Sequence, residues 1–339
     1  MLRARLEGRL HDATVATEEC WRVSSGSAAV LGLRQVAMDA APTTAYLMLG
    51  DRCSRNCAFC TQARESVARL SALSRVTWPL FPAGAAADAV ARAYLKGTIE
   101  RACFQVTVSR GYLARTEQAV ADLARRCHLP VSVSIVPRSA EDVDRLLGAG
   151  AERVTMALDA ACERVHRSVK GGSWNRTMSL LESSARSYPG RIGTHLIVGL
   201  GETEREMAEC VQMLAALSVS IGLFAFTPVH GTALQDWVPP SLARYRRIQV
   251  ARWLIVNGLA RAEGFEYDQQ DSRLCRYGMG AQRLHSLLAG GDAFRTSGCA
   301  GCNRPYYNER PGGVMYNYPR PLTQEEVREE VEALVAGLR

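Results

Sequence analysis

The sequence has no run of apolar residues long enough to cross a membrane. Its first residues, MLRARLEGRLHDA, are charged and lack the apolar core of a signal peptide. We therefore expect a cytoplasmic protein with no membrane partner. The chain also has no basic stripe interleaved with aromatic residues, so we expect no nucleic-acid partner.

The composition is that of an ordinary globular protein. The chain has 339 residues, of which 47% are hydrophobic and 22% charged, enough for one large barrel domain with extensions. Its eleven cysteines, in a chain expected to be cytosolic, favour metal or redox chemistry over a disulfide framework. The formal net charge of +7 indicates either a solvated basic surface or an acidic partner.

Three cysteines within eight residues form the most informative stretch. Cys53, Cys57 and Cys60 follow an apolar run, 44–49, that we interpret as a strand. Three thiolates leave one iron of a four-iron cluster free to bind a substrate or cofactor. The alternatives are a structural zinc site and scattered buried thiols, but zinc would take a fourth ligand nearby, and no Cys or His follows before Cys103.

The spacing C-x3-C-x2-C, with Phe59 before the last cysteine, resembles the signature of the radical S-adenosylmethionine (AdoMet) superfamily. The resemblance implies that Cys53, Cys57 and Cys60 bind a 4Fe-4S cluster and are the catalytic residues, with Phe59 at the cofactor. It implies that AdoMet binds the free iron and that one electron cleaves it to a 5′-deoxyadenosyl radical.

Strand-like and helix-like segments alternate through the middle of the chain, which predicts a parallel sheet with helical crossovers. At least six such units are visible, so we expect a TIM-like (β/α) barrel, complete or partial, with its chemistry at the carboxyl ends of the strands. The predicted strands are 44–49, 103–108, 130–136, 153–159, 191–200 and 220–229, and the predicted helices include 62–70, 84–96, 112–127, 174–188, 202–217 and 242–263.

We expect three parts in the chain. Residues 1–40 are predicted to be a helical preamble with a Gly/Ser loop at 24–33. Residues 41–270 are predicted to form the barrel, and residues 271–339 a C-terminal extension that binds an auxiliary cluster.

Several strand ends resemble the biotin synthase branch of the superfamily. In IVGLGETERE (197–206), Gly199, Gly201 and Glu202 match the adenine-contacting element, although glycines here can serve the turn alone. Asp159 is similar to the acidic residue near the AdoMet ribose, with a helix N-cap as the alternative. Arg176 matches the arginine that pairs with the AdoMet carboxylate, with a surface ion pair as the alternative.

The second strand end departs from the family. Ser109, Arg110 and Gly111 stand where the family has a Gly-Gly-Glu-like element, so the contact to the AdoMet amino group is not predicted there. Gln105 could project into the barrel or be structural.

A second cysteine set lies near the C-terminus. Cys299 and Cys302 form C-x2-C in a segment rich in glycine and proline, and Cys275 lies upstream. A bound metal or cluster would best keep such a segment ordered. The alternatives are an auxiliary 4Fe-4S cluster, with Ser297 or Arg304 near a fourth position, and a zinc knuckle completed by another residue such as His285. The other thiols have no mutual spacing: Cys20, Cys103, Cys127, Cys162 and Cys210.

The segments 45–66, 224–234 and 296–311 resemble one component of the two-component lipoyl synthases. That resemblance implies a radical sulfurtransferase in which an auxiliary Fe–S cluster donates sulfur to a carrier-bound octanoyl chain. It implies an octanoylated lipoyl-carrier protein or domain as substrate, a second radical AdoMet subunit and an external electron donor. Three alternatives stay open: biotin-synthase-like sulfur insertion into a free small molecule, a mutase or maturase that uses the second cluster for electrons, and a noncatalytic scaffold.

Overall fold

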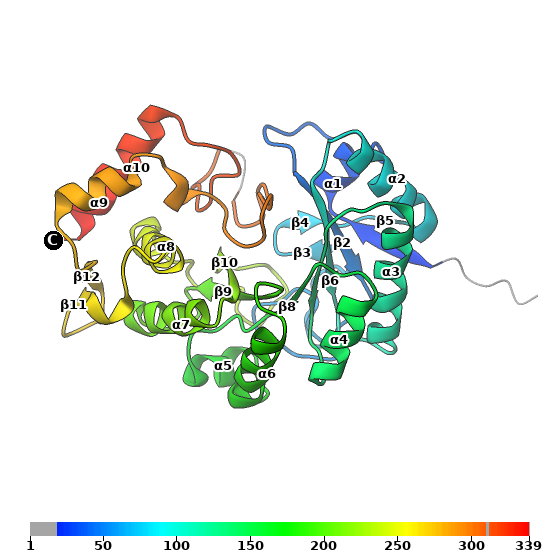
Figure 1. Cartoon of the computed structure of the whole chain (residues 1–339), viewed down its shortest axis with the longest axis horizontal. Coiled ribbons are helices and arrows are strands. Elements are labelled where there is room, and N and C mark those ends of the chain that lie inside the picture. Colours follow the sequence, from blue (N-terminus) through cyan, green and yellow to red (C-terminus); the bar gives the residue numbers. More distant parts are fainter. Residues whose placement is uncertain (1–18, 310–311, 339) are drawn as a thin grey trace, which may run out of the picture.

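The computed structural model describes residues 19–309 and 312–338. Parallel strands form the frame of the molecule. The main sheet has the strand order β10-β9-β8-β7-β6-β2-β1-β5 (Figure 1). Six of these strands are parallel: β2 (Thr44–Leu49), β6 (Arg101–Val106), β7 (Val131–Ile135), β8 (Arg153–Met156), β9 (Ile192–Val198) and β10 (Ser220–Ala225). The strands β1 (Cys20–Val23) and β5 (Leu80–Pro82) extend the β2 edge antiparallel.

The sheet is open. Its hydrogen-bonded order ends with β10 on one side and β5 on the other, so the described residues form a partial barrel. Of the two forms that the sequence predicts, the structure has the partial one. No helix in the described ranges is long and apolar enough to span a membrane.

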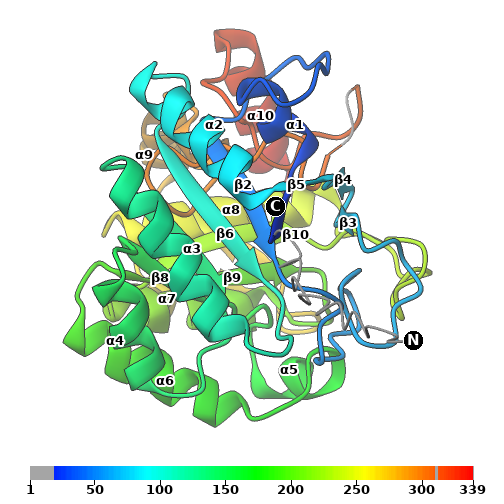
Figure 2. The ribbon, with the colours of Figure 1, turned by 90° about the vertical axis from the view of Figure 1, so that its right-hand side faces the viewer.

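Helices cover the outer face of the sheet (Figures 1 and 2). Helix α3 packs on β2 and β6, α4 on β8, α6 on β9 and α7 on β10. In α3, the buried side chains Leu113, Thr116, Val120 and Leu123 recur every three or four residues, which puts one face of the helix against the strands. The helices are α1 (Ser25–Val30), α2 (Ala83–Leu95), α3 (Tyr112–Arg126), α4 (Ala140–Gly148), α5 (Glu163–Val169), α6 (Trp174–Ser187), α7 (Glu204–Ala216) and α8 (Leu242–Val256).

The strands divide their side chains between the two faces. On β6, Ala102 and Phe104 are fully buried under the helices, and the alternation of a strand turns Cys103 and Gln105 to the opposite face. We call that opposite side the inner face.

The C-terminal extension starts on the outside of the sheet and then returns to the inner face. It contains β12 (Leu274–Arg276), α9 (Ala281–Leu288), η2 (Asp292–Phe294) and α10 (Gln324–Gly337), and it follows η1 (Ala262–Gly264) and β11 (Glu266–Tyr267), which pairs with β12. Helix α10 is fixed on α8 by a buried two-point ion pair in which Arg246 donates to both oxygens of Glu330 at 2.6 and 2.5 Å. Figure 1 shows the orange segment before α10 between β10 and the β2 side of the sheet.

Three local expectations were wrong. Residues 20–23 form β1 and residues 25–30 form α1, where a preamble helix and a Gly/Ser loop were expected; residues 1–18 of that preamble lie outside the described residues. Segment 62–70 contains turns instead of a helix, because Arg52 and Gln62 donate to its carbonyl groups. Helix α8 stops at Val256, since Gly258 takes a left-handed φ of +67° and bonds back to Ile255.

The short hairpin of β3 (Ala72–Leu73) and β4 (Val76–Thr77), together with β5, lies between the predicted helices 62–70 and 84–96, where no strand was predicted. The six parallel strands and the helices α2, α3, α6 and α7 lie within a few residues of their predicted positions.

Candidate functional site

The first cysteine set lies in the loop that leaves β2 at its carboxyl end. The loop is held by backbone bonds to neighbouring strand and helix ends: Ser54 donates to the Val108 carbonyl and Ala58 to the Val169 carbonyl, both at 2.7 Å. The sulfur of Cys53 accepts the backbone N–H of Val108 at 3.3 Å. These bonds hold the loop against the carboxyl end of the sheet.

A glycine permits the loop to leave the strand. Gly50 has a φ of +95°, and a Cβ on this residue would collide with the side chains of Thr107 and Ser109 beyond the end of β6. Only glycine suits both the conformation and the close approach.

Cys53, Cys57 and Cys60 line one cavity together with Phe59. The rest of its wall comes from the inner face of the sheet and from the C-terminal segment: Met48, Gln105, Ser134, His195, Phe224, Tyr307 and Asn308. The structure therefore brings the three predicted thiols and the predicted aromatic residue to one hollow at the carboxyl ends of the strands.

Burial shifts the pKa of two of these thiols. It raises the pKa of Cys57 and raises that of Cys60 to about 12. A metal bound here would have to displace thiol protons, so its affinity would rise with pH. In the described ranges, no three His, Cys, Asp or Glu side chains stand close enough to share a single metal ion. The thiolates of a four-iron cluster bind different irons, so a cluster does not require that close approach.

Asp159 contributes a buried charge to the same cavity. It follows β8 with a φ of +65°, and its carboxylate lies 2.7 Å from the Nζ of Lys170, which also lines the cavity. Lys170 donates further to the Ala157 carbonyl. The N-cap of α5 is Cys162, so the helix-cap alternative for Asp159 is wrong.

Lys170 escaped the sequence reasoning. It stands just after α5 in a run that reads as an ordinary helix end, and only the fold brings its ammonium group to Asp159. His195 was missed for a similar reason: it lies on the inner face of β9, where burial lowers its pKa to about 4 and keeps the ring neutral.

The structure holds Arg176 outside the cavity. Its exposed side chain donates to the Arg138 carbonyl at 2.9 Å, in the loop after β7, and none of the ion pairs among residues 19–309 and 312–338 involves Arg176. Its role toward AdoMet stays a prediction.

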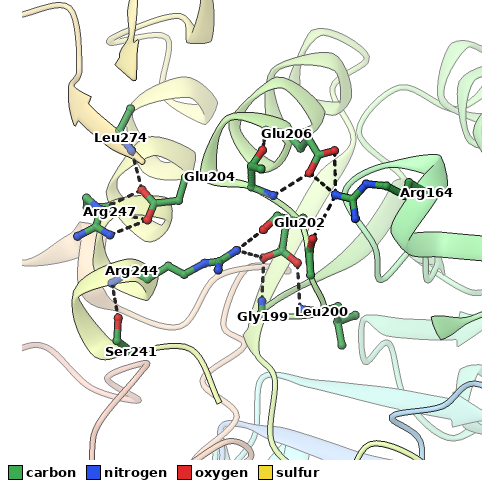
Figure 3. A network of polar contacts seen from close by, with 12 residues as sticks. Arg164, Gly199, Leu200, Glu202, Glu204, Glu206, Ser241, Arg244, Arg247 and Leu274 are labelled. Carbon is green, nitrogen blue, oxygen red and sulfur yellow. Dashed lines mark hydrogen bonds and ion pairs between the residues drawn. The ribbon is translucent and has the colours of Figure 1, made fainter. Parts of the chain in front are cut away.

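Glu202 organises the turn after β9 (Figure 3). Its two carboxylate oxygens accept the N–H groups of Gly199 and Leu200 at 2.8 and 2.9 Å, and Arg244 lies 2.9 Å away. Gly201 completes the turn with a φ of +106°. The carboxylate is thus engaged within its own loop, and contact of Gly199, Gly201 or Glu202 with a cofactor stays a prediction.

The second cysteine set is divided in the structure. Cys299 and Cys302 reach the inner face, where the sulfur of Cys302 lies 3.4 Å from the Tyr46 hydroxyl and that of Cys299 lies 3.4 Å from the Ser132 hydroxyl. Cys275 lies on β12, whose Leu274 donates to Glu204 of α7 on the outer side of the sheet. The structure does not bring Cys275 to the other two, because the sheet and its helices lie between them.

Comparisons with known proteins agree with this geometry. Residues 47–214 match the model of the Radical SAM superfamily. Lipoyl synthase 2, chloroplastic, of Populus trichocarpa is 26% identical over 214 residues, which cover 61% of this chain and 52% of that protein. Lipoyl synthase of Syntrophotalea carbinolica is 24% identical over 206 residues, which cover 58% of this chain and 64% of that protein. The matched part thus spans only half to two thirds of these relatives.

A solved structure supports the fold. The X-ray structure of the FeFe-hydrogenase maturase HydG from Carboxydothermus hydrogenoformans superimposes with a TM-score of 0.52 at 16% identity, over 64% of this chain and 52% of that chain. At this identity the similarity concerns the fold alone. The residues that match the family begin within β2 and include the whole cysteine loop, and the chain belongs to the radical SAM superfamily.

Proposed function

We propose that this chain is a radical AdoMet sulfurtransferase of the lipoyl synthase type, which inserts sulfur into an unactivated carbon of a carrier-bound octanoyl chain. The observation that carries the proposal is the second pair of thiols, Cys299 and Cys302, on the same inner face that lines the cysteine cavity. The names of the two curated relatives support the same reaction class.

The donor set fits the cluster that the family implies. Cys53, Cys57 and Cys60 supply three thiols at one cavity, which suits a 4Fe-4S cluster with one open iron. When bound, that cluster and AdoMet supply the 5′-deoxyadenosyl radical that removes hydrogen from a saturated carbon. The chain's own part is to hold these thiols and to shape the cavity around the reacting carbon.

The cavity wall suits a radical reaction on an apolar chain. Phe59, Phe224 and Tyr307 give it an apolar lining, and His195 is neutral because burial lowers its pKa. Asp159 and Lys170 form its buried ion pair and are available to the polar groups of AdoMet. Water exclusion matters here because a radical intermediate reacts with any group that reaches it.

A second cavity adjoins the first and offers room for an extended substrate. Ser74 and Tyr307 line both cavities, and the second continues past Trp78, Pro228 and Tyr306 toward the surface. An acyl chain on a long flexible arm could enter by this route. The net charge of +7 favours an acidic carrier domain over a free fatty acid.

Anaerobic turnover tests the proposal. The reconstituted protein, with AdoMet and a reductant, is incubated with an octanoylated carrier protein, with free octanoate or with dethiobiotin, and products are read by mass spectrometry. We expect sulfur on the octanoylated carrier, together with 5′-deoxyadenosine. Sulfur on a free small molecule alone would favour the biotin-synthase-like alternative, and deoxyadenosine without any sulfur product would favour a mutase or maturase.

A partner and a reductant complete the proposal. We propose a second radical AdoMet subunit for full turnover, and an external donor for the electron. The turnover assay is therefore run with and without the protein fraction of a clarified cell extract, which a size filter separates from small molecules. Product that forms only when this fraction is added would indicate a missing subunit.

A further inference from the structure

Two rows of side chains cross the inner face of the sheet. Strand pairing sets Met48, Gln105 and Ser134 side by side on β2, β6 and β7, and all three line the cysteine cavity. Two residues nearer the amino ends, the same pairing sets Tyr46, Cys103 and Ser132 side by side. The second row therefore lies about 7 Å deeper than the cavity wall.

The C-terminal loop brings its two thiols to the ends of that deeper row. Cys302 touches the hydroxyl of Tyr46, and Cys299 touches the hydroxyl of Ser132. Cys103 occupies the strand between those two contacts. It packs, like Cys302, against the cluster of Tyr46, Met48 and Trp78. Three thiols thus converge although they come from β6 and from a loop almost 200 residues later.

The loop is held on the sheet by polar contacts on both sides of the thiols. Asn303 accepts the N–H of Thr43 at 3.0 Å, and Arg101 donates to the Ala300 carbonyl at 2.8 Å. On the other side, Ser297 accepts the N–H of Leu223 at 2.9 Å. The positions of Cys299 and Cys302 are therefore set by the fold.

The surroundings of the thiols are cationic. Arg304 follows Cys302 closely, donates its backbone N–H to the Tyr46 hydroxyl at 2.8 Å, and holds its guanidinium 4.0 Å above the centre of the Phe224 ring. Its side chain also donates to the Ser297 carbonyl at 2.8 Å. Among the ion pairs of the described residues, none gives Arg304 a carboxylate partner. A guanidinium in this setting favours an anion, and thiolates or a cluster of iron and sulfide would supply one.

Gln105 connects the two rows. Its amide nitrogen donates to the sulfur of Cys103 at 3.1 Å, while its side chain lines the cysteine cavity. Tyr307 likewise lines that cavity and packs in the cluster that holds Cys103 and Cys302. A group bound at the deeper row would thus face the cavity across Gln105 and Tyr307, together with Met48 and Leu73, which also line the cavity and pack in that cluster.

We propose that Cys103, Cys299 and Cys302 are the thiolate ligands of a second iron–sulfur cluster on the inner face, and that Cys275 is not a ligand. The three thiols lose their protons to solvent when the cluster binds. A role of this cluster as sulfur donor rests on the proposed function, whereas the binding site does not.

Iron and sulfide content test the ligand set without any turnover. The experiment uses the Cys53→Ala/Cys57→Ala/Cys60→Ala chain, reconstituted anaerobically, so that the first site holds no cluster. We expect this chain to keep up to about four irons with matching sulfide and a charge-transfer absorption in the visible range. Adding Cys103→Ser should lower the iron content at least fivefold, as should Cys299→Ser or Cys302→Ser.

Cys275→Ser is the matched control, and it should leave iron and sulfide unchanged. Retained iron in the Cys103 variant together with loss in the Cys275 variant would overturn the proposal. One zinc per chain without sulfide would overturn the identity of the group. Thermal melting checks that each variant folds. If the Cys103 variant does not fold, alkylation of the Cys53→Ala/Cys57→Ala/Cys60→Ala chain, with and without bound iron, tests whether Cys103 is a ligand. Cys103 should then react only after chelation of iron, and reaction at equal rates with and without iron would overturn the proposal.

The outcome is separable from the proposed function. Cluster loss in the Cys103 variant with no sulfur product from the unmodified chain would leave the site standing and reject sulfur insertion. If the unmodified chain inserts sulfur but its Cys103 variant keeps its iron, sulfur insertion stands and the proposed ligand set is rejected.

Discussion

The hydroxyl of Tyr46 lies 3.4 Å from the sulfur of Cys302 and joins the C-terminal loop to β2, the strand that precedes the first cysteine set. The same hydroxyl accepts the backbone N–H of the nearby Arg304. Burial holds the pKa of Tyr46 well above its usual value, so the phenol keeps its proton at physiological pH. One side chain therefore links two parts of the chain that are more than 250 residues apart.

Tyr46→Phe should lower the free energy of unfolding by about 1–3 kcal/mol, because it leaves the Arg304 N–H and the Cys302 sulfur without their partner. Urea unfolding measures the loss. Tyr94→Phe is the control, since its hydroxyl makes a single exposed bond to the His128 carbonyl, and it should change stability by less than about 0.5 kcal/mol. Equal effects of the two substitutions would contradict this account of Tyr46.

Lys170→Met should destabilise the protein by about 3–5 kcal/mol, because it leaves the buried Asp159 carboxylate without its cation. Adding Asp159→Asn should recover most of that loss in a double-mutant cycle. The exposed pair Arg205–Glu209 provides the control, and Arg205→Met should cost less than about 1 kcal/mol. An additive cycle for Asp159 and Lys170 would mean that the two groups do not interact.

Arg176→Ala should weaken AdoMet binding about tenfold or more while the iron content stays constant, if the guanidinium turns from the Arg138 carbonyl to the AdoMet carboxylate. Isothermal titration with the reconstituted protein measures the affinity. Arg186→Ala, on the same helix and paired with Glu182, should leave the affinity unchanged. Identical affinities for both variants would reduce Arg176 to a surface residue.

Acid should destabilise the fold through His166. Its ring is buried against Trp174 with neither nitrogen hydrogen-bonded, and burial lowers its pKa to about 4. Below pH 6.5 the unfolded chain binds a proton that the folded chain does not, so stability falls between pH 6.5 and 4 by up to about 1.4 kcal/mol per pH unit. His166→Gln should flatten this part of the pH profile of unfolding, and His128→Gln, at an exposed position, should not. An unchanged profile in His166→Gln would contradict the assignment.

The sequence predicts the frame of the protein well because the strands are short apolar runs bounded by turn residues. Segment 130–136, for example, matches β7 to within one residue at each end. Prediction from the sequence fails where tertiary contacts decide the local structure. Segment 62–70 has helix-forming residues, but the side chains of Arg52 and Gln62 bond to its carbonyl groups and hold it in turns.

The first cysteine site is predictable because its ligands are neighbours in the chain. The ligand set that we propose for the second cluster is not predictable, because nothing in linear spacing connects Cys103 to Cys299 and Cys302. One signal was nevertheless present. Gln105 could be seen as an inward residue, and the two-residue period of a strand puts Cys103 on the same face. Cys275 was chosen by its closeness in sequence, and the structure leaves it on the outer side of the sheet.

Reductive cleavage of AdoMet tests the central claim most directly. The reconstituted protein, kept anaerobic with a low-potential reductant, is mixed with AdoMet, and 5′-deoxyadenosine is quantified by chromatography. The account predicts product from the unmodified chain and from Cys162→Ala, and at least a hundredfold less from Cys53→Ala/Cys57→Ala/Cys60→Ala, whose cavity has lost its thiols. Deoxyadenosine at the unmodified rate from that triple variant would contradict the assignment of Cys53, Cys57 and Cys60 as the ligands of the catalytic cluster.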